Sequence, residues 1–317
     1  MKKIIAALTL ILMLTMAFAS CGGTRLAMGT GGTGGTYYAF GAVLGNQIKA
    51  STGMTCNAVS TDGSKANILG IHQGDYQLGT VQSDVMAYAW EGAKTFESNG
   101  KISSFRVIGG LYAEAVQLIT TNPDIKTVQD LKGKTVSIGA AGSGVYFNAI
   151  DVLSAADIAL EDITPTYQSF NDSAEALKNG TIDAAFVVAG APTPAVMDLM
   201  AAKQAYLVPI DGEIAASIMA SCPYYTEYKI PAGTYSGQTE DVTTITVKAT
   251  LIVSADLDED TVYNITKAIF DNIEAIKGVH AKGAELSIEN ATSGMAVPFH
   301  KGAAKYFAEK NVTVNAQ

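Results

Sequence analysis

Short apolar segments alternate with amphipathic segments along most of this 317-residue chain, and this alternation limits the fold more than any other feature. Residues 25–28 are typical of a short strand, residues 30–36 form a glycine-rich loop, and residues 37–48 carry apolar side chains at helical spacing. The same order of strand, glycine loop and helix returns over residues 135–156. The pattern predicts an α/β protein with largely parallel sheets.

Two long apolar segments are expected to join two halves of the molecule. Residues 105–121 form a nearly uncharged run that contains two glycines and Glu114, and residues 243–253 are rich in β-branched side chains. Because both can pass between lobes, the sequence predicts two similar α/β lobes joined by a two-strand hinge. Lobe I is expected to hold residues 21–113 and 236–317, and lobe II residues 114–235.

The remaining elements follow from periodicity and from helix start and stop signals. We expect strands over residues 55–59, 76–81, 182–188 and 206–210. Helices are expected from a Ser64 cap to about residue 72, from a Ser83 cap onward, from an Asn171 or Ser173 cap to residue 179, from a capping box at residues 256–259 to residue 278, and over residues 301–310.

The first twenty residues predict export. Two lysines precede an apolar run over residues 4–18 that is too short for a stable membrane anchor, an order typical of a secretory signal. Cleavage after Ala19 would leave Ser20 first, whereas residues 18–21 resemble a lipobox in which Cys21 is acylated. We favour the lipobox because two glycines follow Cys21. The protein is therefore expected at the outer face of the cytoplasmic membrane or in the periplasm, anchored by lipid.

Charge and metal-ligand spacing exclude several classes of function. The net charge is −9, and removal of the leader with its two lysines makes it two units more negative, so nucleic acid and anionic membrane surfaces are not expected partners. The three histidines stand far apart, and no Cys-x-x-Cys occurs, so no metal site and no cofactor is expected. Cys56 and Cys222 could pair in an oxidising compartment or remain free thiols, and their positions leave both open.

The strongest local signal is the loop Gly29–Thr36, which holds five glycines between a strand and a helix. Such a backbone can turn its N–H groups inward, next to the positive end of the helix, and cradle an anion. The loop satisfies G-x-G-x-x-G, but an exported protein meets little NAD and the loop continues with Gly35, so we reject a dinucleotide site. A structural tight turn is the plainer alternative.

The second lobe has a similar glycine-rich loop between a strand and a helix, at residues 139–144. Ser143 can offer a hydroxyl beside the loop N–H groups, and Asn148 in the first turn of the next helix leans toward the loop. Taken alone, an N-cap serine and a solvent-facing asparagine explain these residues nearly as well. One donor-rich loop in each lobe, neither containing Asp or Glu, predicts a small carboxylate ligand held across one cleft and no binding of purely cationic solutes.

An ordered set of short blocks, covering about residues 25–312, resembles the TAXI family of solute-binding proteins, which serve TRAP transporters. The blocks are Gly29–Tyr38, Gly74–Asp84, Asp130–Lys134, Gly142–Gly144, Ala189–Pro194, Ile230–Tyr235 and His300–Ala303.

The resemblance implies a periplasmic-binding-protein type II fold, or Venus flytrap, and a fused TRAP membrane permease driven by an ion gradient as partner. It also implies small carboxylate ligands, notably glutamate, glutamine and dicarboxylic acids. The matching ligand-binding positions are Gly34, Gly35, Thr36, Tyr37, Gln82, Ser83, Ser143, Gly144, Asn148, Gly190, Ala191 and Pro192.

One departure and three alternatives accompany this interpretation. The family usually has threonine where this chain has Val145, so one hydroxyl contact to the ligand is missing. A ligand-sensing subunit for a sensor kinase and a receptor for an ABC transporter would have the same fold. An exported enzyme is disfavoured, because no nucleophile–base or metal constellation is recognisable.

Overall fold

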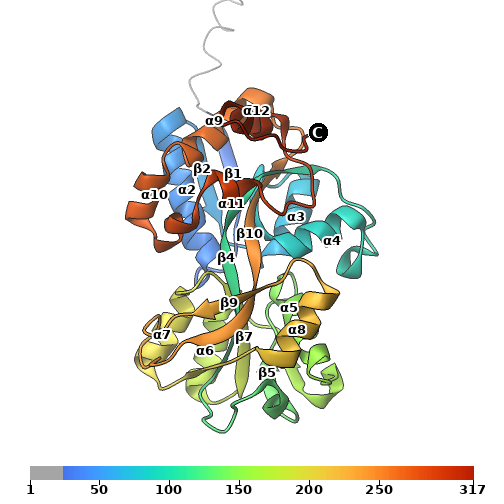
Figure 1. Ribbon diagram of the computed structural model, residues 1–317, viewed down its shortest axis with the longest axis vertical. Helices are drawn as coiled ribbons and strands as arrows, with labels where there is room; N and C mark the ends of the chain where they lie inside the picture. Colours follow the sequence, from blue (N-terminus) through green and yellow to red (C-terminus); the bar gives the residue numbers. More distant parts are fainter. Residues whose placement is uncertain (1–23) are drawn as a thin grey trace, which may run out of the picture.

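Two long strands, β4 (Phe105–Thr120) and β10 (Val242–Ser254), run through the whole molecule and are shared by two α/β lobes (Figure 1). This computed structural model describes residues 24–317, so the predicted signal segment and Cys21 lie outside the described residues. The two-lobed α/β fold and both strand crossings are confirmed. Across residues 24–317, no helix is both long enough and apolar enough to cross a membrane.

Lobe I is built on strands in the order β2-β1-β3-β10-β4. β1 pairs in parallel with both β2 and β3, and β10 runs antiparallel to its two neighbours. The strands specific to this lobe are β1 (Arg25–Gly29), β2 (Thr55–Val59) and β3 (Leu78–Gln82). Its helices are α2 (Thr36–Thr52), α3 (Ser64–Gln73), α4 (Ser83–Glu91), α9 (Glu259–Phe270), α10 (Ile273–Val279), α11 (Ile288–Thr292) and α12 (Lys301–Glu309), with short 3-10 turns η2 (Lys94–Phe96) and η5 (Ala281–Glu285).

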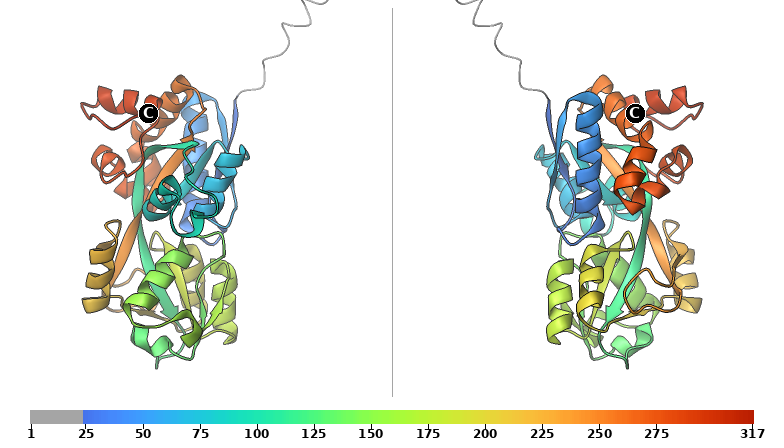
Figure 2. Two further views of the ribbon diagram at one scale, coloured as in Figure 1. Left: turned by 90° about the vertical axis from the view of Figure 1, so that its right-hand side faces the viewer. Right: turned by 90° about the vertical axis from the view of Figure 1, so that its left-hand side faces the viewer.

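Lobe II is built on the second half of β4, which pairs with β7 and β8, followed by β5 and β6. Its strands are β5 (Thr135–Ser137), β6 (Thr164–Thr166), β7 (Ala184–Ala189), β8 (Tyr206–Val208) and β9 (Thr226–Ile230). Its helices are α5 (Val145–Ala155), α6 (Phe170–Asn179), α7 (Pro194–Ala202) and α8 (Gly212–Ser221), with 3-10 turns η3 (Val128–Leu131) and η4 (Leu160–Asp162). The two side views show this lobe stacked below lobe I along β4 and β10 (Figure 2).

Each lobe has its own buried core. Lobe I packs its helices on one continuous cluster that includes Phe40 and Ile269, whereas lobe II has separate clusters around Phe186 and Leu199. The first half of β10 pairs with β9, and its side chains Ile245 and Val247 lie in the core of lobe II. The chain therefore returns to lobe I inside β10, later in the sequence than the boundary expected at residue 236.

Several helix starts differ from the sequence-based expectation because neighbouring residues cap them. Glycine at position 63 and Gln82 precede α3 and α4, so Ser64 and Ser83 are the first helical residues rather than caps. α6 is capped by Ser169, whose hydroxyl accepts from the N–H of Asp172 at 3.2 Å, and not by Asn171 or Ser173.

Two further differences concern whole elements, and the structure also answers the question about the cysteines. The expected helix ending at residue 278 is broken after Phe270 into α9 and α10. Helices α7 and α8 and strand β9 were not predicted. Cys56 in β2 and Cys222 after α8 are free thiols, which settles the question that the sequence left open.

Candidate functional site

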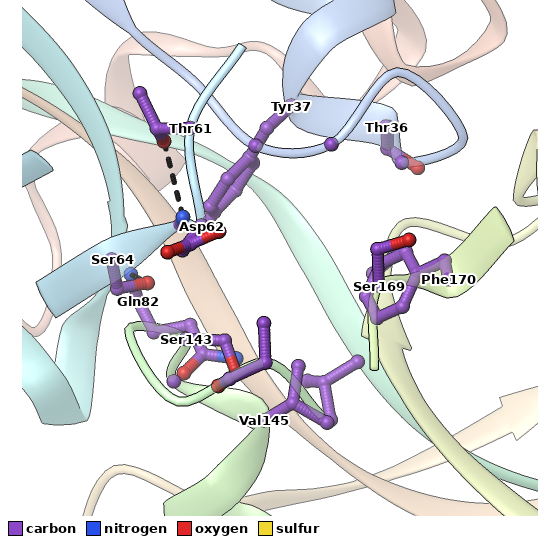
Figure 3. Close-up of a pocket in the computed structure, with 18 of the residues that line it drawn as sticks. Thr36, Tyr37, Thr61, Asp62, Ser64, Gln82, Ser143, Val145, Ser169 and Phe170 are labelled. Atoms are coloured by element: carbon purple, nitrogen blue, oxygen red, sulfur yellow. Dashed lines mark hydrogen bonds between the residues drawn. The ribbon is translucent and has the colours of Figure 1, made fainter. Parts of the chain in front are cut away.

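A cavity that is partly open to solvent lies between the two lobes, with about 580 Å³ of non-atom space that includes this open part. Both lobes line it, and the buried side chain of Glu114 reaches it from the hinge strand β4. Figure 3 shows Tyr37, Asp62 and Gln82 on one side of this space and Ser169 and Phe170 on the other. A small solute in this cavity would contact both lobes at once.

The position of the cavity follows from the parallel strands. Lining residues follow the ends of β1 and β2 in lobe I and of β5 and β6 in lobe II, while Gln82 ends β3 and Val188 and Ala189 end β7. In open α/β sheets, ligands bind outside the carboxyl ends of the strands, where the connecting loops meet. The fold therefore gathers loops that lie far apart in the sequence around one space.

Four helices begin at the cavity: α2, α3, α5 and α6 each contribute their first residue to its lining. The N-caps of the first three are glycines (positions 35, 63 and 144) that make no side-chain cap hydrogen bond, and none of these helices has an acid in its first turn. First-turn N–H groups have no partner inside their own helix. Three helix starts therefore offer donors and partial positive charge to an anion in the cavity.

Glu114 is the only acid in the hinge strand β4, and its side chain is about 1% exposed. The Tyr37 hydroxyl donates a short hydrogen bond to its Oε1. Burial raises the pKa of Glu114 well above its ordinary range, and the hydrogen bond from Tyr37 and the ammonium of Lys282 oppose this rise only in part. Burial and the Glu114 carboxyl together raise the pKa of Tyr37. The buried position therefore favours the protonated form of Glu114 more strongly than water does.

Beside the cavity, a buried polar network joins the lobes. Gln82 Nε2 donates to Asn148 Oδ1 at 3.0 Å, and Asn148 Nδ2 donates to Asp84 Oδ2 at 3.1 Å and to the Tyr225 hydroxyl at 2.6 Å. Burial raises the pKa of Asp84 to about 6. The side-chain oxygen and nitrogen of Asn148 therefore both have their hydrogen-bond partners inside the protein.

The lobes also contact each other directly around the cavity. Thr36 Oγ1 donates to the carbonyl of Gly190 at 2.8 Å, and the N–H of Ala195 donates to the carbonyl of Gly34 at 3.1 Å. Near the second glycine loop, the N–H of Ala66 donates to the carbonyl of residue 142 at 3.2 Å. These bonds cross from one lobe to the other, so the structure is a closed arrangement of the two lobes.

Half of the residues predicted from the sequence meet at the cavity: Gly35, Thr36, Tyr37, Gln82, Ser143 and Gly144. The structure places the other half outside the lining: Gly34, Ser83, Asn148, Gly190, Ala191 and Pro192. Ser83 Oγ accepts from the N–H of Lys248 at 3.2 Å, and Gly34 and Gly190 make the lobe-to-lobe bonds described above. The Ser143 hydroxyl lines the cavity but donates to the carbonyl of residue 140 at 2.6 Å. The direct ligand contacts assigned to these twelve positions remain predictions.

Sequence reasoning missed several lining residues, among them Asp62, Ser64, Glu114, Gln168 and Phe170. Two signals could have found them. Asp62 is a polar residue just after the strand predicted over residues 55–59, where the loops of a parallel sheet converge, whereas Gln168 follows β6, which was not predicted. Glu114 is the only acid inside a long, largely apolar run, and a buried acid of that kind needs a partner or a function.

Metal binding finds no support at this site. Within residues 24–317, no group of three or more His, Cys, Asp and Glu side chains is arranged to hold a metal ion.

Two α/β lobes joined by two crossing strands, with a cavity between them, are the features of the two-lobed binding-protein fold. The chain matches the model of the NMT1-like family over residues 28–310 and belongs to that family. The narrower assignment to the TAXI family remains a prediction.

Solved structures show the same fold. The alkanesulfonate-binding protein SsuA from Xanthomonas axonopodis pv. citri, bound to MOPS, is 16% identical with a TM-score of 0.50 over 92% of each chain. A putative L-cystine ABC transporter from Listeria monocytogenes is 17% identical with a TM-score of 0.52, over 83% of this chain and 98% of that one. A protein from Bordetella bronchiseptica RB50 is 14% identical with a TM-score of 0.54, over 90% of this chain and 89% of that one.

Proposed function

We propose that this chain is the exported solute-binding receptor of an uptake system and not an enzyme. The observation that carries this proposal is the cavity enclosed between two lobes and lined by both. A ligand that touches both lobes binds the closed state better than the open one, and so shifts the population toward closure. Closure then presents a surface that a membrane partner can distinguish from the open form.

The proposed ligand is a small carboxylate, such as glutamate, glutamine or a dicarboxylate. The uncapped starts of α2, α3 and α5 supply N–H donors and partial positive charge from both lobes. Val145 lines the cavity at the position where the TAXI family has threonine, so the donors there are backbone groups rather than a hydroxyl.

The proposed partner is a fused TRAP membrane permease, and this part of the proposal rests on the ordered sequence blocks. An ABC transporter is the alternative, because the structural neighbour from Listeria monocytogenes is a putative L-cystine ABC transporter. A sensor kinase would use the same ligand-induced closure. Ligand uptake by cells separates the first two: collapse of the ion gradient should stop a TRAP system, whereas ATP depletion with the gradient maintained should stop an ABC system.

Membrane attachment is proposed to occur through acylated Cys21, which lies outside the described residues. The native protein should partition into detergent, and Cys21→Ala should remove that behaviour. A mature protein that begins with unmodified Ser20 would contradict the anchor.

The receptor function is tested by identifying what the protein retains. Gentle purification, denaturation and mass spectrometry should release a small carboxylate. Adding that compound back to emptied protein should raise the melting temperature and reduce the radius of gyration. An unchanged radius at saturating ligand would rule out closure, and release of a purely cationic solute would rule out the ligand class.

A further inference from the structure

The cavity lining contains two carboxylic acids and, among the described residues, no basic side chain. Of the residues that the structure describes, none lining the cavity is a lysine, arginine or histidine, whereas Asp62 and Glu114 both line it. The buried ammonium of Lys282 is paired with Glu285 at 2.6 Å and does not line the cavity. No side chain is therefore available to neutralise a ligand of high negative charge, and an uncompensated buried charge is costly.

The partial positive charge of the helix starts is enough to stabilise one ligand carboxylate but not two. Each uncapped start contributes roughly half of an elementary positive charge. The fourth start, that of α6, has Asp172 in its first turn, which offsets its contribution. The starts of α2, α3 and α5 together supply about one and a half positive charges, and the exposed carboxylate of Asp62 adds negative charge beside them. A second ligand carboxylate would enter a site whose positive charge is already used.

The cavity also contains acceptors that need a donor. Gln82 is about 2% exposed, and its Oε1 has no hydrogen-bond partner in the described part of the chain, although its Nε2 is bonded to Asn148. Gln168 Oε1 is likewise buried without a partner. Both side chains line the cavity. Buried acceptors of native proteins are nearly always satisfied, so the donor is expected on the ligand.

We propose that the ligand is a zwitterion of zero net charge, an α-amino acid with an uncharged side chain. Its carboxylate lies at the uncapped helix starts, and its ammonium faces Asp62, Gln82 Oε1 and Glu114. The uncharged side chain lies against the apolar part of the lining, which includes Val145, Phe170 and Val188. This inference rests on the proposed receptor function and narrows its ligand class by disfavouring dicarboxylates.

Calorimetry on the mature chain, freed of retained ligand, tests the ammonium directly with matched pairs. L-Glutamine and glutaramate differ only in the α-ammonium, as do alanine and propionate, and leucine and 4-methylpentanoate. Glutarate serves as the dicarboxylate. In the pair whose side chain fits, the amino acid should bind at least tenfold more tightly than its desamino partner and than glutarate. A desamino acid or glutarate that binds as tightly as the best amino acid would overturn the inference and leave the receptor function standing.

A matched pair of variants locates the ammonium. Asp62→Asn should weaken binding of that amino acid about three- to tenfold and leave its desamino partner unchanged. Asp75→Asn, an equally exposed acid of lobe I that does not line the cavity, should change neither. Equal effects of the two substitutions would contradict the assignment. If no panel member binds, the molecule retained on purification decides. A retained acid that carries an amine and has zero net charge supports the inference, whereas an acid without an amine overturns the inference but not the proposed ligand class. A retained compound without a carboxylate overturns both.

Discussion

Gln82 of lobe I donates its side-chain amide to Asn148 of lobe II at 3.0 Å, and both side chains are buried. Sequence reasoning assigned both residues to the ligand, yet here they bind each other. Because Asn148 also donates to Asp84 and Tyr225, it is the centre of a polar connection between the lobes.

Replacement of Asn148 should therefore destabilise the protein as well as weaken binding. Asn148→Ala leaves Gln82, Asp84 and Tyr225 without a shared buried partner, and each unsatisfied group costs about 1–3 kcal/mol. We expect a loss of about 2–4 kcal/mol in the free energy of unfolding, measured with urea. Asn99→Ala, at an exposed position, is the control. Equal stability of the two variants would show that the network is dispensable.

Gly34 should control closure through its lack of a side chain. A Cβ at this position would lie 2.0 Å from Asn171 Oδ1 and 3.1 Å from the Cβ of Ala195, both in lobe II. Gly34→Ala should weaken affinity for the retained ligand by about tenfold or more, roughly 1.4 kcal/mol, and increase the radius of gyration in solution scattering. The control is Gly278→Ala in α10, where a Cβ also meets nothing within 4 Å and which does not line the cavity. If Gly278→Ala weakens binding as much, lobe contact does not explain the effect.

Asp84 should make stability fall as pH rises. Its pKa is raised to about 6, whereas an unfolded aspartate has a pKa of about 4, so between these values the folded state holds more protons than the unfolded state. Stability therefore decreases through this window and levels off above it.

Asp84→Asn should remove that decrease, because a neutral amide needs no ionisation. Its carbonyl can still accept from Asn148, but its amide protons lack a partner, so we expect a net gain of about 1–2 kcal/mol at pH 8 and none at pH 4. Urea unfolding at both pH values, with Asp75→Asn as control, measures this. A gain that is equal at the two pH values would contradict the role of ionisation.

Ser143 should matter less for a carboxylate than the sequence alone suggests. Sequence reasoning gives its hydroxyl to the ligand, which predicts a loss of roughly 1.5–3 kcal/mol in Ser143→Ala. In the structure the hydroxyl donates to the carbonyl of residue 140 at 2.6 Å, so it has no proton left for a carboxylate. We expect calorimetry to show a loss below about 1 kcal/mol. A loss above 1.5 kcal/mol would show that the hydroxyl turns to the ligand when the site fills.

The sequence by itself determined the class of fold and the two donor-rich loops. Strand and helix periods are local properties, so β2, β4 and α5 were predicted to within a residue or two, and the glycine runs at residues 29–36 and 139–144 marked two loops that line the cavity. Short-range signals failed where two candidate caps compete, as at Ser169 and Asn171.

Only the tertiary structure decided which polar groups face the ligand and which face each other. Asn148 donates to Asp84 of lobe I and to Tyr225, and Ser143 donates to the carbonyl of residue 140 in its own loop. Conversely, Asp62, Glu114 and the free oxygen of Gln82 became part of one cavity only because loops after separate strands converge. The charge of the site depends on that convergence in space, and no local pattern in the sequence contains it.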